Sequence, residues 1–207
     1  LQLGIICALL LLIGLMAFVT MMIRSTLPIE FLILLPFFAI IISILFDSRT
    51  AFRWLVIAVL MVAGIRGNDF TIAIAGLAAG VLAIFTVRDI KSRTQLFRSI
   101  AFSMLGYTIA ILALGLERAD SIADMSLQLG FAAINAVISP VLTFGVILLI
   151  ENLFNVATDL KLLEYDDLNH PLLRALADKA PGTYQHTLTI ARLAESAAVA
   201  INANPLL

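Results

Sequence analysis

Charged residues are scarce in this sequence. Asp, Glu, Lys and Arg make up 13% of its 207 residues, against roughly 25% in a soluble globular domain. The formal net charge is −1, so no basic face indicates a nucleic-acid partner. A single cysteine, Cys7, excludes a disulfide within the chain. Long stretches of low hydrophobicity are also missing, which argues against disorder.

Hydrophobic residues are correspondingly abundant, at 62% of the chain. A membrane span needs about 20 apolar residues to cross roughly 30 Å of hydrocarbon, and six segments meet or approach that length. The predicted spans are residues 1–23, 27–46, 51–65, 70–87, 100–116 and 127–150. The sequence therefore predicts an all-α fold whose first part, residues 1–150, is a polytopic transmembrane helix bundle of six spans.

Lys and Arg in the short loops predict the orientation of these spans, because cytoplasmic loops carry an excess of both. The loop after the fourth span is basic, with Arg88, Lys91, Arg93 and Arg98. The loop after the fifth span is mainly acidic, with Glu117, Asp120 and Asp124 against Arg118. With the basic loop inside the cell, residue 1 and the tail after residue 150 are both expected in the cytoplasm.

A few residues inside the spans break the apolar pattern. Gly76 and Gly80 form a GxxxG motif, which lets helices approach closely. The motif favours packing within the chain over a homodimer interface, and both stay open. Asn135 and Pro140 lie in the sixth span, where an amide prefers the bundle interior and a proline removes a backbone hydrogen bond.

The tail has the composition of a soluble protein. We divide it into a connecting helix and turn at 151–170 and a helical region at 171–207. Pro181 and Gly182 are expected to end a short helix, and Thr183 to cap the next one. On that last helix, His186 shares an apolar stripe with Ile190, so its side chain is expected to point inward. Taken alone, an inward histidine is more often a core residue than a metal ligand.

The tail closely resembles the membrane–cytoplasm junction of the seven-transmembrane HD-domain family, which are membrane-bound HD phosphohydrolases that include bacterial cyclic di-AMP phosphodiesterases. The matching segments are residues 158–164 (Thr-Asp-Leu-Lys-Leu-Leu-Glu), 169–173 (Asn-His-Pro-Leu-Leu) and 180–187 (Ala-Pro-Gly-Thr-Tyr-Gln-His-Thr). In the membrane part the resemblance is looser. It implies that the six spans are helices two to seven of the family's module, in the inner membrane of a bacterium.

The resemblance implies that His186 is the first metal ligand of an HD domain whose His-Asp pair would follow after residue 207. The complete domain would hold a divalent metal, iron or manganese, and act on a cyclic dinucleotide. The metal would lower the pKa of a bound water that attacks phosphorus. No catalytic residue is expected within this chain, which by itself should be inactive and hold no metal.

The favoured interpretation is the membrane module and truncated HD domain of a phosphohydrolase regulated from outside the cell. The helical run from Pro140 to Glu164 indicates a connecting helix, so Asn135, Pro140, Glu151 and Asp159 are candidate signal-coupling residues. Two alternatives stay open. One is a small transporter or channel, and the other is a plain membrane anchor, with the lipid bilayer as the common partner.

Overall fold

The computed structural model describes residues 2–23, 26–87, 95–154, 162, 168–201 and 203. Every regular element within these ranges is a helix, which confirms the predicted all-α class. The chain divides into two compact units, Leu1–Val156 and Ala157–Leu207.

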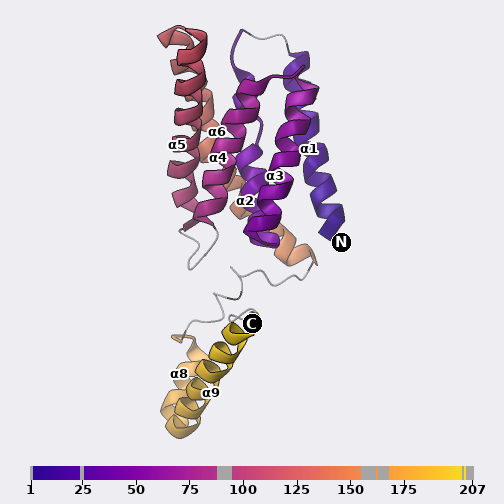
Figure 1. Cartoon of the computed structure of the whole chain (residues 1–207). Helices are drawn as coiled ribbons and strands as arrows, with labels where there is room; N and C mark the ends of the chain where they lie inside the picture. The colour runs from indigo at the N-terminus through magenta and orange to yellow at the C-terminus, as the bar shows by residue number, and fades with distance from the viewer. Residues whose placement is uncertain are drawn as a thin grey trace. The chain divides into compact units, whose positions relative to one another are not determined.

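The first unit is a helical bundle (Figure 1). Its elements are α1 (Gln2–Met22), the 3-10 turn η1 (Ile29–Leu32), α2 (Leu35–Leu45), α3 (Ser48–Ile65), α4 (Phe70–Thr86), α5 (Gln95–Arg118) and α6 (Ile122–Phe154). Helices α3 and α4 pack together, with α1 against α3 and α5 against α4. Helix α2 contacts α3, α4 and α6, and all its residues except Leu45 are buried.

Five helices are long and apolar enough to cross a membrane, within the ranges that the structure describes: Gly4–Met22, Ser48–Ile65, Phe70–Val87, Arg98–Arg118 and Ile122–Ile150. Their outward faces carry large apolar side chains, among them Leu11, Leu60, Phe85 and Leu149, each more than 60% exposed. Polar side chains such as Asn135 are instead fully buried. Apolar side chains outside and polar side chains inside are the reverse of the pattern in a water-soluble protein, and they suit a bundle surrounded by lipid.

The second predicted span, residues 27–46, is wrong as a continuous helix. The structure divides it into η1 and the 11-residue α2, which together stay below the length of the five spanning helices. Pro28 precedes η1 and Pro36 lies in the first turn of α2. A proline has no N–H and disfavours a helical conformation in the residue before it, so composition alone overestimated the length of the helix.

This broken segment nevertheless runs from one end of the bundle to the other. Glu30 in η1 pairs with Arg66, which follows the last residue of α3. Asp47, just after α2, caps the first turn of α3. The 18 residues of α3 separate those two ends by about 27 Å. Over the described residues the chain therefore crosses the bundle six times, and one crossing is not a continuous helix.

Asp47 sets the start of α3 earlier than the predicted residue 51. Its carboxylate accepts a hydrogen bond of 2.7 Å from the Thr50 amide and one of 2.9 Å from the Thr50 hydroxyl. The bond from the Thr50 amide is the main reason that the pKa of the Asp47 carboxyl is lowered. Helix α3 therefore begins at Ser48, with Asp47 as its N-cap.

Three glycines allow close packing around α4. Gly76 and Gly80 lie against neighbouring helices of the same chain, because a Cβ atom would meet Leu35 of α2 at 2.2 Å and Leu55 of α3 at 2.6 Å. Gly106 of α5, which the sequence did not single out, is held more tightly. A Cβ there would lie 2.7 Å from backbone atoms of Ala78 and Ala79 in α4.

The second unit contains α8 (Pro171–Lys179) and α9 (Pro181–Ala200), which pack against each other. His170 caps α8 by accepting a hydrogen bond of 3.3 Å from the Leu172 amide at its Nδ1. The expectation that Thr183 caps α9 is wrong, because α9 begins at Pro181 with Ala180 as its N-cap. Proline suits the first helical position, where its missing N–H and fixed φ are tolerated.

The Gly106 contact predicts opposite effects for the same substitution at two glycines. Gly106→Ala should lower the free energy of unfolding by about 1–3 kcal/mol, because backbone atoms cannot move aside for the new methyl group. Gly145→Ala in α6, where a Cβ meets nothing within 4 Å, should leave stability unchanged or raise it by up to about 1 kcal/mol. Reversible unfolding in mixed detergent micelles measures both, and equal effects at the two positions would contradict the proposed contact.

Candidate functional site

The break between η1 and α2 leaves backbone polar groups at membrane depth. In an α-helix the Leu35 amide would bond to the carbonyl of Phe31, but here it donates to the Ile33 carbonyl at 2.7 Å. Phe31 and Ile33 are both buried, so water does not reach them. Irregular backbone in a bilayer must find partners within the protein, because each unpaired group costs several kcal/mol.

Asn135 of α6 supplies those partners. Its Nδ2 donates to the carbonyl of Phe31 at 2.6 Å and to that of Ile33 at 2.8 Å. The same nitrogen lies 3.1 Å from the hydroxyl of Tyr107 in α5, so three acceptors share two hydrogens. Asn135 thereby joins the broken segment, α5 and α6, and the structure places this predicted residue in the bundle interior.

The side-chain oxygen of Asn135 is also hydrogen-bonded. Ser139 Oγ donates to Asn135 Oδ1 at 2.8 Å, and Thr143 Oγ1 donates to the Ser139 carbonyl at 2.8 Å. Asn135, Ser139, Thr143 and Tyr107 are all fully buried. We call these four side chains, with the carbonyls of Phe31 and Ile33, the Asn135 cluster.

A hydroxyl stripe on α5 continues from the Asn135 cluster. Ser99, Ser103 and Tyr107 recur at every fourth position and are fully buried. Ser103 Oγ has no hydrogen-bond partner in the described part of the chain. The stripe and the cluster consist of hydroxyl and amide groups without a charge, which can hold helices together by hydrogen bonds across the bundle.

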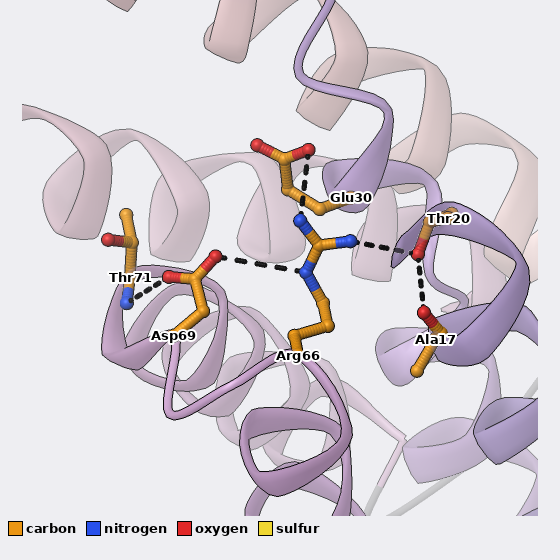
Figure 2. A network of polar contacts seen from close by, with 6 residues as sticks. All are labelled: Ala17, Thr20, Glu30, Arg66, Asp69 and Thr71. Carbon is orange, nitrogen blue, oxygen red and sulfur yellow. Dashed lines mark hydrogen bonds and ion pairs between the residues drawn. The ribbon is translucent and has the colours of Figure 1, made fainter. Parts of the chain in front are cut away.

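A second polar network gathers around Arg66, between α3 and α4 (Figure 2). The guanidinium donates to Thr20 Oγ1 of α1 at 3.0 Å. It also pairs with Glu30 at 3.5 Å and with Asp69, the N-cap of α4, at 3.7 Å. Asp69 in turn accepts from the Thr71 amide at 3.0 Å. We call this the Arg66 network, and it connects α1, η1, α3 and α4 at one end of the bundle.

Arg66 is well shielded, since its side chain is 14% exposed, while Glu30 is 23% and Asp69 is 28% exposed. Ion pairs shielded in this way are screened less by salt than pairs on an open surface. Arg66 was not predicted, although it is the basic residue in the loop after the third span. Ser139 and Tyr107 were not predicted either. Ser139 lies one turn after Asn135, and that spacing was the available signal, whereas Tyr107 lies on another helix, 28 residues before Asn135.

The remaining predicted coupling residues are only partly described. Pro140 lies inside α6, which continues as a helix through it and ends at Phe154. Glu151 belongs to that helix, but its side chain is not among those described. Asp159 lies outside the described residues. The cluster therefore contains Asn135 from the predicted set, and α6 continues past residue 150 to Phe154, as expected for the start of the predicted connecting helix.

His186 lies on α9 and is exposed, as are Ile190 and Leu193 of the same apolar stripe, at 50% and 66%. Across the described residues, no group of three His, Cys, Asp or Glu side chains comes together in a way that could hold a metal ion. His186 is therefore one potential ligand without companions in this part of the structure.

The sequence of the bundle matches the model of a known protein family. The model for the 7TM receptor with intracellular HD hydrolase matches residues 3–158. The chain belongs to this family. No solved structure matches it.

Named relatives extend the match into the tail. A cyclic-di-AMP phosphodiesterase PgpH of Listeria monocytogenes serotype 1/2a is 33% identical over 183 residues, which cover 86% of this chain and 26% of the relative. A protein of the same name from Bacillus subtilis is 28% identical over 179 residues, covering 82% and 25%. An uncharacterized protein of Synechocystis sp. is 49% identical over 63 residues, covering 30% and 8%. The chain thus spans about a quarter of the length of the two PgpH relatives.

The Asn135 cluster predicts a large cost for removing the amide. Asn135→Leu keeps the volume and removes the donors, so the free energy of unfolding should fall by about 1–3 kcal/mol, because the Phe31 carbonyl loses its bond from Asn135 and the Ile33 carbonyl keeps only the bond from the Leu35 amide. Tyr107→Phe, which removes one of three acceptors, should cost less than about 1 kcal/mol. Ile134→Leu, at a half-exposed neighbour, is the control. Unfolding in mixed micelles gives the comparison, and a neutral Asn135→Leu would show that the carbonyls have other partners.

Proposed function

We propose that this chain is the membrane module, with the first part of the HD domain, of a metal-dependent phosphohydrolase that hydrolyses cyclic di-AMP and is regulated from outside the cell. The observation that carries the proposal is the family match over residues 3–158, extended by two relatives named as cyclic-di-AMP phosphodiesterases. The chain itself would serve as the bilayer-embedded part and the start of the enzyme domain, at 171–207.

His186 would contribute the first metal ligand. In the structure its side chain is exposed on α9, and the described residues form no group of three metal-ligating side chains. The described residues therefore do not form a metal site by themselves, so the divalent ion, iron or manganese, would need further ligands from the rest of the HD domain. The exposed apolar stripe of α9 would then be the surface on which the rest of the HD domain packs.

The proposed orientation places the tail in the cytoplasm of a bacterium, with the module in its inner membrane. The basic loop between α4 and α5 supports this orientation, because Lys and Arg are enriched in cytoplasmic loops. The end of the bundle with Asp47, at the start of α3, would then be cytoplasmic. The opposite end, with the Arg66 network, would face the outside, where a regulatory ligand would act.

Helix α6 is the proposed route between the two sides. It is continuous over 33 residues, or about 50 Å, and so spans the bilayer and reaches beyond it. Asn135 anchors it to the bundle, while Pro140, Glu151 and Asp159 lie along the way to the tail. We expect the activity of the HD domain to depend on how this helix is held.

The two histidines of the chain offer a matched test of the enzyme assignment. In the full-length protein, His186→Ala should reduce hydrolysis of cyclic di-AMP by at least about 100-fold, the loss typical of removing a metal-site group. His170→Ala should keep most of the activity, because His170 is not a proposed metal ligand. Its Nδ1 caps α8 by accepting a hydrogen bond from the Leu172 amide. Initial rates with added Mn²⁺ measure both variants. An active His186→Ala protein would refute the ligand assignment.

A second test addresses transmission through α6. Two glycines inserted after Asn152, inside α6, in the full-length protein should interrupt the helix, since glycine is about 1 kcal/mol less favourable than alanine in a helix. We expect basal hydrolysis of cyclic di-AMP to remain and its response to extracytoplasmic conditions to disappear. Insertion of two alanines is the control for added length. Regulation that survives the glycine insertion would favour a plain membrane anchor.

A further inference from the structure

The η1 turn is held from two directions by groups that do not contact each other. On one side, the Glu30 carboxylate pairs with Arg66 at 3.5 Å. On the other side, the carbonyl of the next residue, Phe31, accepts the 2.6 Å bond from Asn135, and Ile33 adds a second bond of 2.8 Å. Within residues 30–33, Glu30 therefore contacts Arg66, and the carbonyls of Phe31 and Ile33 both bond to Asn135.

This arrangement joins the two polar networks mechanically. Glu30 and Phe31 are adjacent residues of the same short 3-10 turn. The turn is stabilised internally by the bond from the Ile33 amide to the Glu30 carbonyl at 3.1 Å. If a change at Arg66 displaces η1 as a unit, the Phe31 carbonyl, which accepts from Asn135, is displaced with it.

We infer that η1 is the element that couples the Arg66 end of the bundle to α6. A change at the Arg66 network, such as loss of the Glu30 pair, shifts η1 and releases or repositions Asn135. Because α6 is one continuous helix from Ile122 to Phe154, a displacement at Asn135 is carried to its far end. The inference deepens the proposed regulation of the HD domain and rests on it for its biological meaning.

The Arg66 network is suited to receive a signal. Its carboxylates are about one quarter exposed, so they are accessible from the aqueous end of the bundle. Arg66 Nε is buried and has no hydrogen-bond partner in the described residues, with Asp69 at 3.7 Å. The guanidinium therefore keeps one buried donor that its present contacts do not use, whereas the Asn135 amide uses both its oxygen and its nitrogen.

The test measures the position of α6 directly. Spin labels at Phe85→Cys in α4 and Leu149→Cys in α6, both exposed, report the distance between the two helices in nanodiscs. The background carries Cys7→Ser, because Cys7 is exposed and would also be labelled. Glu30→Gln removes the charge that pairs with Arg66 and should shift the distance distribution. Arg118→Gln, a charge removed from an exposed site on α5, should not.

The coupling through η1 is then tested in an Asn135→Leu background, where the link to α6 is cut. The shift caused by Glu30→Gln should be lost there. Size-exclusion profiles and helical circular dichroism check that each variant is folded. If Asn135→Leu does not assemble, the comparison of Glu30→Gln with Arg118→Gln still decides, since an unchanged distance overturns the inference. A shift of the same size in both backgrounds overturns it as well.

These outcomes are independent of the enzyme assignment. If the proposed function fails, the full-length protein does not hydrolyse cyclic di-AMP, but the distances between labels still respond to Glu30→Gln. If η1 does not couple the two networks, hydrolysis remains and the distances do not change. The two failures are therefore distinguishable.

Discussion

The hydrogen bonds from Asn135 to the carbonyls of Phe31 and Ile33 are the interaction on which the architecture of the bundle depends. A lipid bilayer offers no water to an unpaired carbonyl, and the chain breaks its helix between η1 and α2. One side-chain amide on α6 resolves this conflict. It keeps α6 in contact with η1, and it allows the short α2 to occupy the buried centre of the bundle.

Around this centre the balance of forces differs from that in a water-soluble domain. Lipid tails are as apolar as leucine, so burying apolar side chains between helices brings little gain. Close contact and hydrogen bonding must compensate. The chain provides both, through Gly106, which brings α5 against the backbone of α4, and through the buried hydroxyl and amide groups of α5 and α6. The large apolar side chains are left for the lipid-facing surface.

Much of this fold could be predicted from the sequence, and the reasons for the failures are specific. Long apolar runs predicted α1, α3, α4, α5 and α6 to within several residues at each end. The same method wrongly predicted one continuous span over residues 27–46, because hydropathy does not take account of how Pro28 and Pro36 affect the backbone. The short helix before Pro181 was predicted correctly, since α8 ends at Lys179, but Pro181 was not recognised as the first residue of α9.

The polar contacts were harder to predict than the helices. Asn135 stood out as an amide within an apolar run, but its partners are backbone carbonyls about 100 residues earlier, and no local pattern indicates them. Arg66 was overlooked because it looked like an ordinary loop residue. Its partners Thr20, Glu30 and Asp69 come from three other places in the chain. The family assignment succeeded because it rested on consecutive residues of the tail.

The separation between Ile33 and Asn135, 102 positions along the chain, has a consequence for biogenesis. During synthesis the broken segment enters the membrane well before α6 exists. Until α6 is inserted, the Phe31 carbonyl of that segment lacks the amide to which it bonds in the assembled bundle. Insertion of α6 therefore supplies the last hydrogen-bond donor for the broken segment, so η1 can take its final place only after α6 has been made.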